Sequence, residues 1–175
     1  MDESAAISVE SSSDSVQVLH ELLQCARNQS TRDALNLAFS FPPEVQSDPY
    51  LAIEIGKFAR ELGEAELMLR FGRTAHKGMP GNAPIANTYA EFLTRERRYV
   101  DAVAALIDTF CTSLDSGVAA HLRMAVRGAQ AREMPDGEKT ALGQAAMQLA
   151  AVLNQDADTH HAAILQACIE LHGLV

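Results

Sequence analysis

The 175-residue chain carries 14 basic and 23 acidic side chains, a formal net charge of −9, and 47% apolar residues. This length and apolar content suit one globular domain with a substantial core, and they exclude a wholly disordered chain. No apolar run approaches the ~18 residues that a membrane span needs. A net charge of −9 disfavours nucleic-acid binding, which depends on cationic side chains at the phosphates.

The three cysteines, Cys25, Cys111 and Cys168, lie far apart among apolar residues, and no CxxC pair occurs. Cysteines in this pattern typically act as small buried apolar side chains and do not form zinc or redox sites. The first residues are acidic and lack the apolar segment of a secretory signal. We therefore expect a cytoplasmic protein without metal or cofactor, and the Ala-rich composition favours a bacterial source.

The N-terminal residues 1–14 hold five serines, four acids and no base, which predicts a disordered tail. From Ser15 onwards the apolar residues follow helical spacing, with Asp14 or Ser15 as the expected N-cap. The sequence thus predicts a tail over 1–14 and a helical domain over 15–175.

Helices follow one another in pairs along this domain. A helix over about 16–26 precedes one that Thr31 caps and Pro42-Pro43 ends. Asp48-Pro49 opens the next helix and Gly63 ends it. Further helices are expected over 64–74, 84–95, 99–110, 118–132 and 139–153, with a last one from Asp158 or Thr159 to about His172. Nothing alternates like a strand, so the predicted fold class is all-α.

Residues of similar type recur when the sequence is shifted by 34 positions. Ala59 falls on Leu93 and Met68 on Ala102, and the preceding unit keeps the same phase. A single helix hairpin cannot bury its apolar face, so consecutive units must stack, and small residues let the helices approach closely. A fourth unit requires a shift of 35 to bring Gly128 into phase.

Two successive units resemble the tetratricopeptide repeat (TPR) family. The matching residues are Ile55-Gly56, Ala59, Gly72, Ala75 and Pro80, then Tyr89-Ala90, Leu93, Tyr99, Ala102 and Leu106. The resemblance covers about residues 16–110 and implies a TPR-like α-solenoid of three to four antiparallel helix pairs plus a C-terminal helix. It departs from the family at Met68, where Ala is usual, and in having no Trp.

The resemblance also implies a concave groove lined by the first helix of each unit. By position, the groove residues are Leu19, Leu23, Tyr50, Ile53, Lys57, Arg60, Asn87, Glu91 and Arg95, with Arg27, Glu61, Thr94, Leu122 and Val126 as further candidates. Residues 57–98 carry a net charge of +3 between acidic ends. This basic band is either an ordinary solvated helix surface or a surface that steers an acidic or amphipathic partner segment.

The expected function is therefore a non-catalytic protein–protein interaction module that binds a peptide or protein segment. Residues 63–71 are similar to the first-repeat turn of class II type III secretion chaperones, which makes a chaperone for translocator proteins one alternative. The others are a docking or regulatory domain of a larger enzyme and a self-assembling, homo-oligomeric repeat.

No catalytic or metal-binding arrangement is predicted. The GxSxG, HExxH and GxGxxG patterns are absent. His161, Cys168 and His172 share one face of a predicted helix. The first two lie about 10 Å apart along the helix axis, which is too far for one ion.

Overall fold

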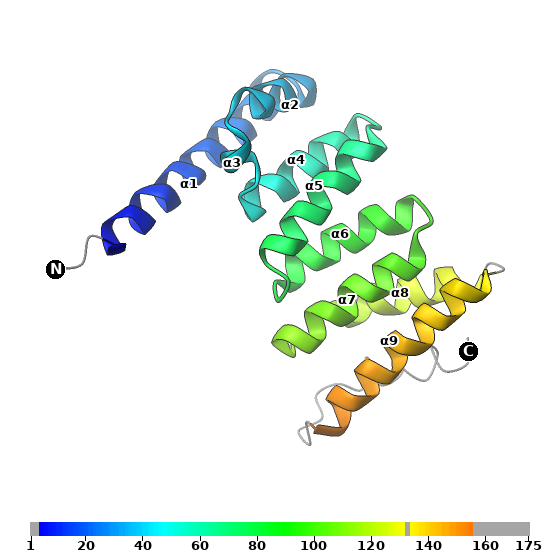
Figure 1. Ribbon diagram of the computed structural model, residues 1–175. Helices are drawn as coiled ribbons and strands as arrows, with labels where there is room; N and C mark the ends of the chain where they lie inside the picture. Colours follow the sequence, from blue (N-terminus) through cyan, green and yellow to red (C-terminus); the bar gives the residue numbers. More distant parts are fainter. Residues whose placement is uncertain (1–3, 132–133, 156–175) are drawn as a thin grey trace. The chain divides into compact units, whose positions relative to one another are not determined.

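The computed structural model describes residues 4–131 and 134–155, and all regular structure within these ranges is helical (Figure 1). The all-α prediction is thereby confirmed. The elements are α1 (Ser4–Asn28), α2 (Thr31–Ser40), α3 (Pro43–Gln46), α4 (Pro49–Glu61), α5 (Ala65–Gly78), α6 (Ala83–Arg95), α7 (Tyr99–Ser113), the 3₁₀ turn η1 (Ser116–Val118), α8 (Ala119–Gln130) and α9 (Asp136–Gln155). They fall into two compact units, Met1–Gly78 and Met79–Val175, which are described separately below.

In the first unit, α4 and α5 form a closely packed hairpin, and α1 and α2 pack together and against α4. The core contains the fully buried Leu22, Leu35, Leu51, Ile55 and Met68. Two polar contacts at the surface tie α2 to the α4–α5 turn. Thr31 Oγ1 donates to Glu61 Oε2 at 2.8 Å, and Arg32 forms an ion pair with Glu64 at 3.1 Å.

In the second unit, α7 is the central helix because it packs against α6, α8 and α9. Its buried face meets large side chains from each of these neighbours. The fully buried residues of this core are Phe92, Leu93, Leu106, Ile107, Phe110, Leu122 and Leu142.

The 34-residue repeat is visible in the helix boundaries themselves. The second helices α2, α5 and α7 begin at Thr31, Ala65 and Tyr99, at intervals of 34 residues. The N-caps of α4 and α6, Asp48 and Asn82, are also 34 residues apart, and the side-chain oxygen of each accepts from backbone N–H groups of the first turn. A carboxylate or amide oxygen at this position satisfies donors that the helix leaves open.

The turns inside the two helix pairs are built alike. Gly63 N–H donates to Arg60 O at 3.2 Å, and Arg97 N–H donates to Thr94 O at 3.0 Å. Both residues are left-handed, with φ of 76° at Gly63 and 58° at Arg97. One geometry is therefore formed by glycine in one pair and by arginine in the next, although only glycine adopts it without steric cost.

This equivalence predicts opposite effects for exchanges at the two positions. Gly63→Ala should destabilise by about 1–2 kcal/mol, since a Cβ is unfavourable at positive φ. Arg97→Gly should be neutral or stabilise by up to ~1 kcal/mol, and Arg97→Ala should change stability by less than ~0.5 kcal/mol because it keeps the Cβ. Urea unfolding followed by circular dichroism measures all three. An equal loss for Gly63→Ala and Arg97→Gly would contradict the shared turn geometry.

Small residues lie where the helices approach most closely, as the repeat predicted. Ala59, Ala75 and Ala102 are fully buried. A Cβ added at Gly128 in α8 would lie 2.2 Å from Cε1 of Tyr99 at the start of α7. Gly128 therefore leaves room for the Tyr99 ring in the α7–α8 contact.

Several boundaries differ from those expected. The first helix begins at Ser4, so Asp14 and Ser15 are not its cap, and the cap of α2 is Ser30 and not Thr31. The short helix α3 begins at Pro43, the second residue of the proline pair, because proline is well suited to a first helical turn. The division into a tail over 1–14 and a domain over 15–175 stays a prediction, and the expected helix over 158–172 lies outside the described residues.

Candidate functional site: a hollow between α6 and α8

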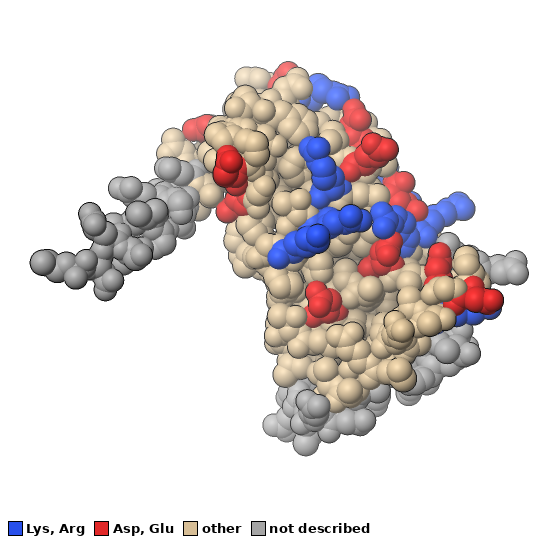
Figure 2. Space-filling view, in the orientation of Figure 1, with Lys and Arg blue, Asp and Glu red and all other residues tan. Residues whose placement is uncertain are grey.

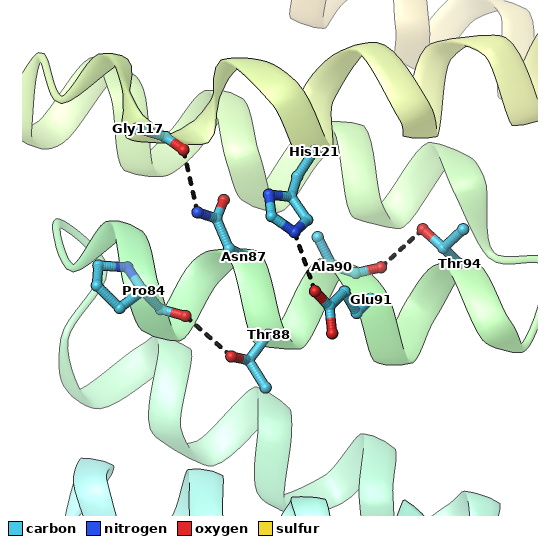
Figure 3. Close-up of polar contacts among 8 residues, drawn as sticks. All are labelled: Pro84, Asn87, Thr88, Ala90, Glu91, Thr94, Gly117 and His121. Carbon is cyan, nitrogen blue, oxygen red and sulfur yellow. Dashed lines mark hydrogen bonds and ion pairs between the residues drawn. The ribbon is translucent and has the colours of Figure 1, made fainter.

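The face shared by α6 and α8 in the second unit contains a hollow of about 270 Å³ (Figure 3 shows part of this face). It is lined by Ala90, Glu91, Thr94, Arg95, His121 and Met124. The α6 residues occupy successive positions of one helix face, and His121 and Met124 lie one turn apart on α8. The sequence therefore places both walls on regular helices, which hold the side chains at defined positions.

Two contacts hold α8 and the preceding turn against α6 (Figure 3). Asn87 Nδ2 donates to Gly117 O at 3.0 Å, and His121 Nε2 lies 3.0 Å from Glu91 Oε1. The first joins a helix side chain to the backbone of η1, and the second joins the walls of the hollow directly. These two contacts therefore fix the positions of the two helices that form the hollow.

Among the residues that line the hollow, the cation Arg95 and the apolar side chain of Met124 are both exposed. Met124 is 55% exposed, so its apolar side chain is accessible to a ligand. Arg95 is exposed, and its guanidinium has no hydrogen bond or ion pair within the described part of the chain. At the floor Ala90 is buried, and Thr94 Oγ1 donates to the Ala90 carbonyl at 2.7 Å (Figure 3). This surface can accept an apolar group beside an anionic one.

The groove residues predicted in this unit have different roles. Glu91 and Arg95 line the hollow together with Thr94, whereas Asn87 is engaged with Gly117. Leu122 and Val126 are fully buried, which corrects the expectation that they face a partner. His121 and Met124 were not among the predicted groove residues, and nothing in the sequence distinguishes them from other residues on α8.

In the first unit, a second hollow of about 550 Å³ lies between the middle of α1 and the α3–α4 segment. It is lined by Ser15, Val16, Leu19, Glu44, Ser47, Asp48 and Tyr50. The predicted residues Leu19 and Tyr50 are both part of it, and Tyr50 is 51% exposed. Asp48 is the N-cap of α4, so this hollow includes a helix start.

The other groove residues predicted in the first unit are less accessible. Ile53 is only 5% exposed, which corrects the expectation that it lines an open groove. Lys57 pairs with Glu54 on its own helix, and Leu23 and Arg60 are half-buried. Because the two units are described separately, a continuous groove through both stays a prediction.

The described cysteines and helices point to no other chemistry. Burial, and to a lesser extent the nearby Asp108 carboxylate, raise the pKa of the Cys111 thiol, which disfavours the nucleophilic thiolate. Within 4–131 and 134–155, no three His, Cys, Asp or Glu side chains are grouped closely enough for a metal ion, and no helix could cross a membrane. His161, Cys168 and His172 lie outside these residues.

Comparison with known proteins gives structural matches only, since no family model and no curated protein matches the sequence. One match is a MamA RS-1 ArsTM double mutant, with a TM-score of 0.54, 14% identity, and coverage of 91% of this chain and 93% of that one. Another is MamA 41-end from Desulfovibrio magneticus RS-1, with a TM-score of 0.53, 16% identity, and coverage of 91% and 94%. MamA is a TPR-like protein.

The chain has a TPR-like helical repeat fold. At these identities the likeness concerns the fold alone. The TPR-like fold makes α6 and α8 the first helices of consecutive units, and α7 the second helix between them. The hollow therefore lies on the first-helix surface, where the resemblance to TPR repeats implied a groove.

Proposed function

We propose that this TPR-like protein is a non-catalytic interaction module, and that the α6–α8 hollow binds a peptide segment of another protein. The observation that supports this most is the exposed Met124 beside Arg95, above the floor of Ala90. Methionine and arginine are both enriched at interfaces, and Arg95 has no partner among the described residues.

The same groups define the chemistry of the segment. An apolar side chain of the ligand packs against Met124 and Ala90, and a neighbouring Asp or Glu pairs with Arg95. Glu91 on α6 pairs with His121 on α8. A second acid of the ligand next to Glu91 is therefore disfavoured, because two carboxylates repel each other. The preferred segment is thus amphipathic, with one acid beside one apolar residue.

A random peptide display library selected on the wild-type protein tests this. Selected peptides should share an acid adjacent to an apolar residue. Arg95→Ala and Met124→Ala should each weaken their binding about tenfold, corresponding to ~1.4 kcal/mol, because each removes one of the two main contacts. Fluorescence anisotropy with the selected peptides measures these affinities.

Matched controls lie on α9 of the same unit. Lys139→Ala removes an exposed cation and Met147→Ala removes a methionine that is 64% exposed. Both should leave binding within a factor of two. Equal losses in the α9 and hollow variants would place the binding site elsewhere.

The alternatives that the sequence leaves open differ in the ligand of this surface. A secretion chaperone and a docking domain of a larger enzyme would both use a peptide-binding surface, whereas a self-assembling repeat would bind its own chain. Light scattering across a range of concentrations distinguishes the last of these, because a self-assembling repeat gains mass with concentration.

A further inference from the structure

The exposed face of α5 in the first unit is strongly basic. Arg70, Arg73 and Lys77 follow the spacing of one helix face and are all exposed. They line a shallow groove of about 370 Å³ together with Glu66, Leu69 and Thr74. Figure 2 shows Lys and Arg side chains gathered over this helix. These three residues are called the α5 basic face below.

The α5 basic face is exposed to solvent, and the side chain of Arg70 is held in place by an aromatic ring. The opposite side of α5 buries Met68, Phe71 and Ala75. The Arg70 guanidinium lies 4.6 Å from the centroid of the Phe71 ring, and that ring is tilted against Phe39 of α2 at 6.0 Å. A cation stacked on an aromatic ring loses less freedom on binding an anion than a side chain extended into water.

The helix dipole explains only part of this charge. Basic residues in a last turn stabilise a helix, which accounts for Lys77. Arg70 and Arg73 lie further from the C-terminal end, beyond the reach of that effect. Glu66 is the one acid among the residues that line the groove. Three exposed cations on one helix face create a local positive potential in a chain of net charge −9, and this potential favours an anionic ligand.

We propose that the α5 basic face binds an acidic polypeptide segment, at a site separate from the α6–α8 hollow. Successive Asp or Glu side chains of the segment pair with Arg70, Arg73 and Lys77, and an apolar side chain covers Leu69. Each arginine can donate two parallel N–H···O hydrogen bonds to one carboxylate.

The overall charge favours a narrow ligand over an extended anionic surface. A membrane or a nucleic-acid duplex would face many of the acidic groups of this chain as well as the basic strip, and would be repelled by them. A single extended segment lies within about 10 Å of the strip, the distance beyond which salt screens exposed charges. It therefore experiences mainly the local positive charge.

The test uses a fluorescein-labelled peptide of about ten glutamates, which lacks the apolar residue that the α6–α8 hollow is proposed to bind, and measures its anisotropy at low and at physiological salt. The variant combines Arg70→Gln, Arg73→Gln and Lys77→Gln. The control combines Arg32→Gln, Arg97→Gln and Lys139→Gln, which removes the same charge from exposed positions elsewhere. The α5 variant should bind at least about tenfold more weakly, and the control within about twofold.

Equal losses in the two variants, or no binding by the wild type at low salt, would overturn the proposal. Binding to phosphatidylserine vesicles without binding to the peptide would overturn it in favour of a lipid surface. Arg95→Ala and Met124→Ala should leave binding of this peptide unchanged, so failure of the α6–α8 proposal and failure of this one are distinguishable.

Discussion

Replacing Ala102 by Glu is expected to lower the free energy of unfolding by at least ~3 kcal/mol. Ala102 is fully buried on α7, at the position where the repeat requires a small side chain. Glutamate would place a carboxylate among apolar groups without a partner, and it would also exceed the space available. Urea unfolding followed by circular dichroism measures the change.

The control for this substitution lies on the same helix. Ala104 is exposed on α7, so Ala104→Glu introduces the same side chain and charge at a solvated position. Its effect should stay within ~0.5 kcal/mol. If Ala102→Glu unfolded at the same urea concentration as Ala104→Glu, the assignment of the buried face of α7 would be wrong.

Truncating Phe92 to alanine is expected to destabilise the second unit by about 3–5 kcal/mol. Phe92 is fully buried and is among the largest side chains of this core. The loss combines the transfer of its ring from the core with the cavity left behind, because the surrounding helices relax only partly. Thermal and urea unfolding provide two independent readings.

A half-exposed phenylalanine provides the comparison. Phe39 of α2 is 39% exposed and contacts the Phe71 ring. Phe39→Ala should therefore cost only about 1 kcal/mol, the value of an aromatic contact at the surface. Equal losses at Phe39 and Phe92 would contradict the expectation that the effect of truncation follows the burial of the ring.

The fold could be predicted from local signals because these signals are repeated. The N-cap oxygens of Asp48 and Asn82 each act within one helix start and recur 34 residues apart, and the left-handed turns at Gly63 and Arg97 follow at the same interval. The expected start of the first helix near Ser15 was wrong, because α1 begins at Ser4 and the serines and acids before Ser15 show no apolar periodicity that would have extended the helix.

The candidate site was harder to predict because it depends on which helices cover which faces. Ile53 lies on a first helix at a groove position, but α1 and α2 pack against α4, and Ile53 is buried. Leu122 and Val126 are similarly in the core. The role of His121 arises only from its contact with Glu91, 30 residues away, and helical periodicity carries no information on such a pair.

The measurement that tests the central claim most directly is site-specific photo-crosslinking at the α6–α8 hollow. Benzoylphenylalanine replaces Met124, or Met147 on α9 as the control, and cells of the source organism are irradiated. The account predicts a discrete adduct with another polypeptide from position 124 that disappears when Arg95 is changed to alanine, and no such adduct from position 147. The absence of an adduct at position 124, or the same adduct from both positions regardless of Arg95, would contradict it.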